Sequence, residues 1–141
     1  MLIRSVMTKK VVTVEMDDSL LEVQRIFANV RFHHLLVIEN DRLVGIISDR
    51  DLFKALSPFV GTLAELPRDA TVLKRKAHQI MSRNPVGVSA TDTVDQGVAL
   101  LFEHGLSCLP VVSEDGKVEG IVTWQDLLRA YYEGHRRGET A

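Results

Sequence analysis

Two short segments of the chain place a hydroxyl and a carboxylate at the same spacing. The segments read GIISDRDL over residues 45–52 and GIVTWQDL over residues 120–127. In the first, Asp51 follows Ser48 by three positions, and in the second Asp126 follows Thr123 in the same way. This spacing is typical of a capping box, in which two side chains satisfy free amides at the start of a helix. A carboxylate can equally accept hydrogen bonds from paired hydroxyls of a ligand, so a capping role and a binding role are both open.

The two segments are corresponding parts of an internal repeat. Residues 3–56 align with residues 77–131 when Gly116 is treated as one extra residue in a turn, and the alignment pairs Met7 with Met81. A unit of about 55 residues is only marginally stable alone, because domains of this size bury only about 60% of their unfolded surface. We therefore expect two copies of one fold that pack against each other, sheet to sheet.

Each copy is predicted to begin with a strand and a helix. The β-rich runs cover residues 11–14 and 85–88, and the second begins with a proline, which suits the start of a strand. Ser19 with Glu22 and Thr93 with Gln96 have the spacing of capping boxes before the helices. The inward faces of these helices are expected to comprise Leu20, Val23, Phe27 and Val30, and Val94, Gly97, Leu101 and His104. Gly105 is expected to end the second helix.

Each copy is predicted to end with a hairpin and a second helix. The hairpin strands cover residues 35–38 and 43–48, and residues 109–112 and 118–123. Polar turns join them at Asn40-Asp41 and Asp115-Gly116. The closing helices are expected over 49–56, stopped at Ser57-Pro58, and over 124–133.

The predicted fold class is α/β, with two tandem β-α-β-β-α units. The expected divisions are a first domain over residues 1–58, a linker over 59–76, a second domain over 77–133 and a loose tail over 134–141. Short helices are expected on either side of Pro67, over 63–66 and 72–81.

This unit, with its Gly-hydrophobic-hydrophobic-Ser/Thr-x-x-Asp segment, resembles the cystathionine β-synthase (CBS) domain. The openings Val6-Met7-Thr8 and Ile80-Met81-Ser82 are similar to the usual opening of that family. Two such domains in tandem resemble a Bateman module, here over residues 1 to about 133. The resemblance implies two repeats related by a pseudo-twofold axis and packed through their sheets.

The resemblance also implies a regulatory function. Members of the family bind an adenosine-containing ligand, such as AMP, ADP, ATP or S-adenosylmethionine, in clefts between the repeats, and require no cofactor. Carried over to this chain, Asp51 and Asp126 hold the ribose hydroxyls, and Ser48 and Thr123 meet a phosphate or their own helix end. The base lies beside Thr13, Val14, Gly87 and Val88, and the phosphates lie beside His33, His34, Arg50 and Ser107. The family commonly forms homodimers and signals to a separate effector protein.

A ligand-free, homodimeric protein-interaction module is the alternative function. Clefts filled by side chains such as Trp124 would exclude a nucleotide, and Gly87 lacks the side chain that Thr13 offers to a base. Arg50, on the first turn of a helix, can simply be solvated. Stabilisation by an adenosine-containing ligand would separate the two functions, because a ligand that binds the folded state raises the melting temperature.

Composition and spacing argue against other functions. With 17 Lys plus Arg against 19 Asp plus Glu, the net charge of -2 indicates no nucleic-acid partner. Apolar runs fall short of the ~20 residues that span a bilayer, and a single Cys108 fits a reducing compartment, so we expect a cytoplasmic protein without a membrane partner. His33 and His34 point to opposite faces of a strand, and Gly105 separates His104 from Cys108. We therefore expect no metal site, no catalytic residue and no enzyme activity.

Overall fold

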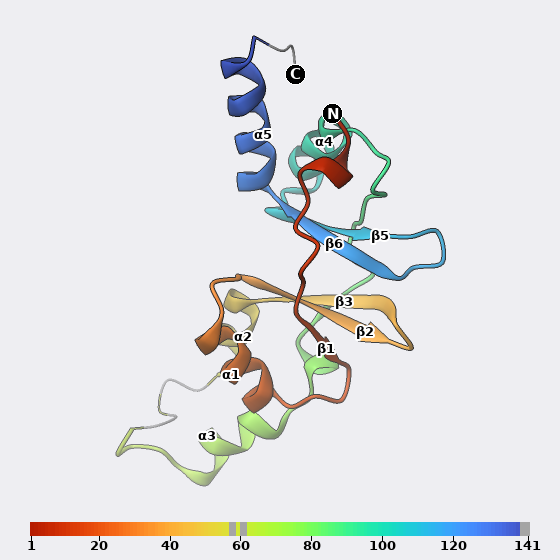
Figure 1. Cartoon of the computed structure of the whole chain (residues 1–141). Helices are drawn as coiled ribbons and strands as arrows, with labels where there is room; N and C mark the ends of the chain where they lie inside the picture. The colour runs from red at the N-terminus through yellow and green to blue at the C-terminus, as the bar shows by residue number, and fades with distance from the viewer. Residues whose placement is uncertain (57–58, 60–61, 139–141) are drawn as a thin grey trace. The chain divides into compact units, whose positions relative to one another are not determined.

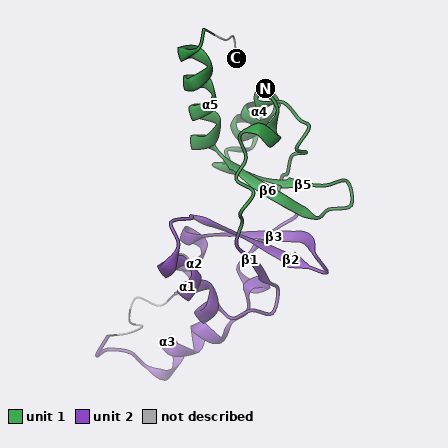
Figure 2. Ribbon diagram, in the orientation of Figure 1, with its two compact units in different colours: residues 1–11, 85–141 green, residues 12–84 purple. Residues whose placement is uncertain are grey.

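The computed structural model describes residues 1–56, 59 and 62–138, and the chain divides into two compact units (Figure 2). One unit comprises residues 12–84, and the other comprises residues 1–11 together with 85–141. The leading segment of the first repeat, residues 1–11, thus belongs to the unit that contains the second repeat. The leading segment of the second repeat, residues 77–84, belongs to the unit that contains the first.

The unit of residues 12–84 is built on a four-stranded sheet with the order β1-β2-β3-β4, and Figure 1 labels the first three of these strands. Strand β1 is parallel to β2, whereas the β2–β3 and β3–β4 pairs are antiparallel. Its strands are β1 Thr13–Glu15, β2 His34–Glu39, β3 Arg42–Ser48 and β4 Ser82–Arg83. Its helices are α1 Leu20–Asn29, α2 Asp49–Ala55, α3 Pro67–Thr71 and the short 3-10 turns η2 Val72–Lys74 and η3 Ala77–Gln79.

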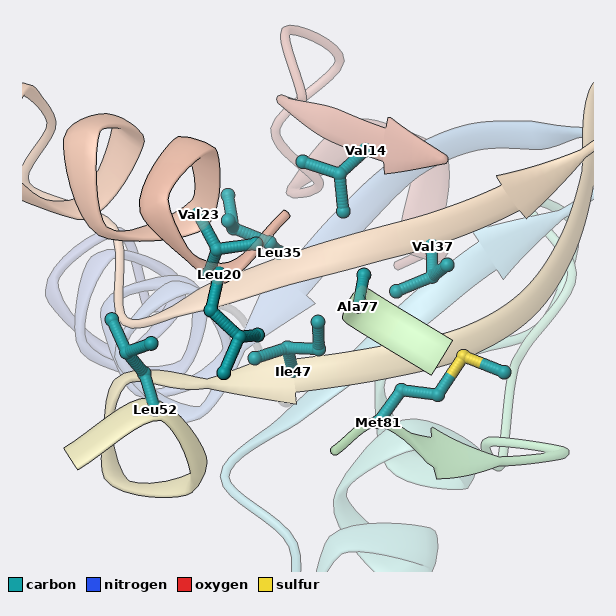
Figure 3. Packing of buried hydrophobic residues seen from close by; sticks show 9 residues of the cluster. All are labelled: Val14, Leu20, Val23, Leu35, Val37, Ile47, Leu52, Ala77 and Met81. Atoms are coloured by element: carbon teal, nitrogen blue, oxygen red, sulfur yellow. The ribbon is translucent and has the colours of Figure 1, made fainter. Parts of the chain in front are cut away.

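The core of this unit forms where α1 and α2 pack on the sheet (Figure 3). Leu20 and Val23 lie three residues apart on one face of α1, so both point at the strands. Leu35 and Val37 alternate along β2 and meet them from the sheet. The complete buried cluster is Val14, Leu20, Val23, Leu35, Val37, Ile47, Leu52, Ala77 and Met81. Because Ala77 and Met81 belong to it, the leading segment of the second repeat completes the core of the first.

The other unit has a two-stranded sheet and two longer helices. Its elements are η1 Ile3–Ser5, α4 Val94–His104, β5 Cys108–Val112, β6 Val118–Thr123 and α5 Trp124–Arg136. Ile3 is fully buried in the core beside Leu109 and Val111. Thr8 forms an antiparallel bridge to Ile121, with N–H···O distances of 2.8 and 2.9 Å. The leading segment of the first repeat is therefore held by both packing and backbone hydrogen bonds.

The prediction of a strand over residues 85–88 is wrong, because these residues do not form one. Only Val88 pairs there, in a single parallel bridge to Val111, and its N–H and C=O both bond to β5. Pro85 has no N–H to donate, and a Cβ on Gly87 would lie 3.2 Å from the carbonyl oxygen of Pro110. These residues therefore pass close to β5 without extending the ladder.

Most other expected elements are confirmed, although the first strand covers Thr13–Glu15 rather than residues 11–14. Both hairpins form, and Asn40 and Asp41 have φ of 53° and 63°, as a two-residue turn between twisted strands requires. Gly105 ends α4 in the left-handed conformation. Of the two boxes expected before α1 and α4, the one at Thr93 and Gln96 is fully reciprocal, whereas Ser19 caps α1 only by accepting from the Glu22 amide.

Four expectations at the ends of elements need correction. His104 is exposed rather than inward, because α4 ends there. Residues 63–66 are not helical, and the helix begins at Pro67, whose fixed φ suits a first helical position. In place of the helix expected over 72–81, two 3-10 turns cover Val72–Lys74 and Ala77–Gln79. Helix α5 continues to Arg136, so the tail is not loose from residue 134. The stop at Ser57-Pro58 lies outside the described residues.

Candidate functional site

The first candidate site lies where β3 passes into α2. Ser48 ends the strand and caps the helix. Its N–H donates to Oδ2 of Asp51 at 2.8 Å, and the Asp51 N–H donates to Oγ of Ser48 at 3.0 Å. This reciprocal pair confirms the capping box. It also holds the Asp51 carboxylate in one orientation, half-buried, with Oδ2 used by the cap.

The start of β2 adds two imidazoles to this junction. The carbonyl of His33 accepts from the Asp49 N–H at 2.9 Å, and His33 Nδ1 donates to Oδ2 of Asp49 at 2.8 Å. This hydrogen bond lowers the pKa of the Asp49 carboxyl below its ordinary value of 3.8. His34 lies opposite Ser48 in the β2–β3 ladder. Burial is the main cause that lowers the pKa of His34; His33 adds to this effect, and Asp49 and Asp51 oppose it.

Strand β1 lies beside β2 and carries two of the residues expected at the base. Thr13 is opposite Leu36 and is half-buried, whereas Val14 is opposite Val37 and is part of the core. In the other unit, Val88 is also a core residue. Because the Val14 and Val88 side chains are used by the fold, of these three only the Thr13 side chain is partly accessible.

The second candidate site, at the passage from β6 to α5, has the same backbone frame. The N–H and hydroxyl of Thr123 donate to Oδ2 of Asp126 at 2.8 and 3.0 Å, and the Asp126 N–H donates to Oγ1 of Thr123 at 3.3 Å. The Trp124 N–H donates to the carbonyl of Ser107 at 3.0 Å, as Asp49 does to His33. Cys108 lies opposite Thr123, as His34 lies opposite Ser48. Burial raises the pKa of the Cys108 thiol to about 12, so this thiol is neutral.

The second junction differs from the first in its side chains. Nη1 of Arg129 lies 3.9 Å from Oδ1 of Asp126, whose side chain is only 13% exposed. The Trp124 side chain, by contrast, is on the surface. The Asp126–Arg129 pair was missed in the sequence analysis, although Asp-x-x-Arg on a helix predicts it. The His33–Asp49 hydrogen bond could not be predicted from local spacing, because the whole hairpin separates the two residues.

Each unit thus gathers part of the expected site. The first junction brings together Ser48, Asp51 and both histidines, with Arg50 exposed on the first turn of α2. The second brings together Thr123, Asp126 and Ser107. In the described parts of the chain, no group of three or more His, Cys, Asp or Glu residues is placed to hold a metal ion. None of the described helices is long and apolar enough to span a membrane.

A protein-family model for the CBS domain matches the chain twice, over residues 3–58 and 77–133. A CBS domain-containing protein of Dictyostelium discoideum is 35% identical over 130 residues, which cover 90% of this chain and 88% of that protein.

Solved structures of CBS domain pairs have the same fold. The CBS domain pair of protein MJ0100, in complex with 5′-methylthioadenosine and S-adenosyl-L-methionine, matches with a TM-score of 0.77 and 25% identity, over 94% of this chain and 97% of that one. CBSX2 from Arabidopsis thaliana matches with a TM-score of 0.79 and 27% identity, over 96% of each chain. A structure of CBSX2 in complex with AMP has a TM-score of 0.80 at 24% identity, over 96% of this chain and 98% of that one. The α/β fold of tandem CBS repeats is therefore confirmed.

Proposed function

The chain belongs to the CBS domain family, and we propose that it is a non-catalytic regulatory module that binds an adenosine-containing ligand at its two strand-to-helix junctions. AMP, ADP, ATP and S-adenosylmethionine are the candidate ligands. The proposal depends most on one observation: a carboxylate is held in the same orientation by the same capping frame at Ser48–Asp51 and at Thr123–Asp126. The adenosyl ligands of the MJ0100 domain pair support this ligand class.

In this proposal the paired hydroxyls of the ribose donate to Asp51 or Asp126. The cap uses Oδ2 of each residue, so the sugar approaches the side of Oδ1. At Asp126 this oxygen lies 3.9 Å from Nη1 of Arg129. That distance is too long for a direct hydrogen bond, so Arg129 leaves Oδ1 able to accept from the sugar. Ser48, His34 and Arg50 face the phosphates at the first junction, whereas Thr123 serves its own helix end at the second. Thr13, Val14 and Val88 lie on the base side, the two valines through their backbone.

The regulatory part of the proposal follows from ligand binding. A ligand changes a conformation only when it binds one state more tightly than another, so an adenosine-containing ligand would shift an equilibrium between two arrangements of the protein. A second copy of the chain or a separate effector protein would respond to that shift by binding one arrangement more tightly than the other. The hydroxyl oxygens of Ser48 and Thr123 accept the amides of Asp51 and Asp126 in the helix caps, and we therefore propose no catalytic step for them.

Thermal denaturation with AMP, ADP, ATP and S-adenosylmethionine tests this function. A ligand at 100 times its dissociation constant stabilises the folded state by about 2.7 kcal/mol, which is easily measured as a raised melting temperature. Asp51→Asn and Asp126→Asn keep an oxygen for the cap but remove the charge. Asp18→Asn and Asp92→Asn are matched controls, because these carboxylates also accept one backbone amide each, in turns away from the junctions.

The expected result is a shift in the wild-type protein and in both controls, reduced by each junction variant and abolished in the double variant. No shift with any of the four ligands would contradict the proposed function. An unchanged shift in the double variant would leave Asp51 and Asp126 as caps only.

A ligand-free homodimeric interaction module is the second candidate, and one feature of α5 favours it. Trp124, Leu128 and Tyr132 recur every four residues and are 48%, 59% and 61% exposed, so they form an apolar stripe along one side of the helix. Analytical ultracentrifugation of wild-type protein and of Leu128→Glu would test it. Dimers that the variant disrupts, together with no response to any nucleotide, would favour this function over ligand binding.

A further inference from the structure

The backbone amides at the two junctions make the same set of hydrogen bonds within the chain. At the first, the N–H groups of Ser48, Asp49 and Asp51 are used by Asp51, His33 and Ser48. At the second, the N–H groups of Thr123, Trp124 and Asp126 are used in the same way. A phosphate cannot use these amides without displacing the chain's own acceptors. Any difference in ligand preference between the junctions must therefore come from side chains.

The side chains at equivalent positions differ in their charge and in their hydrogen-bonding groups. The equivalences follow from the shared hydrogen bonds and ladder pairs, and they match His33 with Ser107, His34 with Cys108, Asp49 with Trp124 and Arg50 with Gln125. The first junction thus has two imidazoles, a carboxylate and a guanidinium, while the second has a hydroxyl, a neutral thiol, an indole and an amide. Arg129, the cation on the first turns of α5, lies against Asp126.

The carboxylate of Asp49 does not cancel the advantage of the first junction for an anion. Its Oδ2 accepts from His33 at 2.8 Å, so one of its two oxygens is already engaged within the chain. Arg50 is exposed and presents five N–H donors in a planar fork that fits a phosphate. Phosphate oxygens form their strongest hydrogen bonds with such charged donors. Moving a phosphate out of water without such donors costs free energy.

We propose that the two junctions select different adenosine ligands: the first takes one that carries a 5′-phosphate, the second takes one that does not, and Arg50 is the residue that determines this difference. The inference rests on the proposed function and extends it by assigning a ligand class to each junction. AMP and adenosine are suitable probes, because they share the base and the ribose and differ only in the phosphate.

Each junction can be measured by itself by calorimetric titration. Asp126→Asn leaves the first junction intact, and there AMP should bind at least about tenfold more tightly than adenosine, which corresponds to about 1.4 kcal/mol. Asp51→Asn leaves the second intact, and there the two ligands should agree within about threefold, or 0.7 kcal/mol at about 1.4 kcal/mol per factor of ten. Trp124 is the only tryptophan and follows Thr123 directly, so its fluorescence should respond to adenosine in Asp51→Asn.

Exchanging the two exposed residues at the second helical position gives the decisive comparison. Arg50→Gln, added to Asp126→Asn, should remove the preference for AMP, and Gln125→Arg, added to Asp51→Asn, should create one. Both positions are on the surface, so circular dichroism and the melting temperature should show that the variants fold. Rising salt should weaken AMP binding at the first junction more than adenosine binding, because screening acts on the charge alone.

Equal ratios of AMP to adenosine affinity at the two junctions, or no effect of either exchange, would overturn this assignment while leaving the proposed function in place. A wild-type protein that binds neither probe nor any of the four adenosine ligands would overturn the proposed function itself. The two failures are therefore distinguishable in one set of titrations.

Discussion

Replacing Gly120 by alanine should loosen the leading segment from β6. A Cβ at this position would lie 2.7 Å from the carbonyl oxygen of Thr8 and 3.1 Å from Sδ of Met7. The nearest atom belongs to the backbone and cannot rotate away. Thr8 is also tied to Ile121 by two hydrogen bonds of 2.8 and 2.9 Å, so the segment can only retreat by stretching them.

The cost follows from these distances. Ordinary van der Waals contact begins at 3.4 Å, so the Thr8 oxygen must move by about 0.7 Å, the difference between 3.4 and 2.7 Å. The same movement would take both hydrogen bonds to roughly 3.5 Å, beyond the usual upper limit of about 3.2 Å. Two weakened bonds of about 1 kcal/mol each give a loss of about 2 kcal/mol in the free energy of unfolding.

Urea unfolding followed by Trp124 fluorescence would measure this loss, since Trp124 is in the same unit. The equivalent glycine, Gly45, is the internal comparison, because the nearest atoms there are the sulfur and Cγ of the flexible Met81 side chain. Gly45→Ala should therefore cost less than Gly120→Ala, and its cost should be smaller still when it is measured in a Met81→Ala background, because Met81→Ala alone already removes a core side chain. Met7→Ala should not rescue Gly120→Ala, because the carbonyl of Thr8 remains. An unchanged stability of Gly120→Ala, or full rescue by Met7→Ala, would refute this reasoning.

Three smaller effects are expected at other side chains. The hydrogen bond from His33 lowers the pKa of Asp49, so the pair stabilises the fold above the ordinary carboxyl value of 3.8 and ceases to do so as the pH falls through the lowered folded value. The difference in melting temperature between wild type and Asp49→Asn should therefore be small and positive at neutral pH and vanish in acid; a difference that grows in acid would contradict it. The buried Cys108 thiol, with its pKa raised to about 12, should react with a disulfide reagent at pH 8 only as fast as the protein unfolds, and rapid reaction of the native protein would disprove its burial. Tyr131→Phe removes the hydrogen bond from α5 to Asp95 on α4 and should lower the free energy of unfolding by about 1 kcal/mol, whereas Tyr132→Phe should not.

The local features of the fold could be predicted because each depends on neighbours in the chain. The capping residues Ser48, Thr93 and Thr123 lie within three positions of the groups they bind. The turn at Asn40-Asp41 needs only residues that tolerate a positive φ. The strand expected over 85–88 failed for the opposite reason, because the length of a strand depends on what its partner offers, and β5 pairs there only with Val88.

The candidate site was predictable in its chemistry but not in its geometry. The spacing of Ser48 and Asp51 indicated both a cap and a ligand site, and the cap is present. The His33–Asp49 bond needs a hairpin to bring residues 16 positions apart within 2.8 Å, so no local pattern predicts it. Arg129, by contrast, lies three residues after Asp126 and was recognisable from helical spacing alone.

By itself, the order of residues determined the repeated unit, its caps and turns, and the twofold occurrence of the Ser/Thr-x-x-Asp pair, because these follow from periodicity and from contacts over a few positions. Only the tertiary structure decided that each repeat's leading segment packs into the unit of the other repeat, with Thr8 bonded to Ile121 and Met81 buried beside Ile47. Such contacts depend on the path of the whole chain. They also need a close approach of each leading segment to Gly45 or Gly120, which the missing side chain of glycine permits but which the sequence around the glycine does not specify.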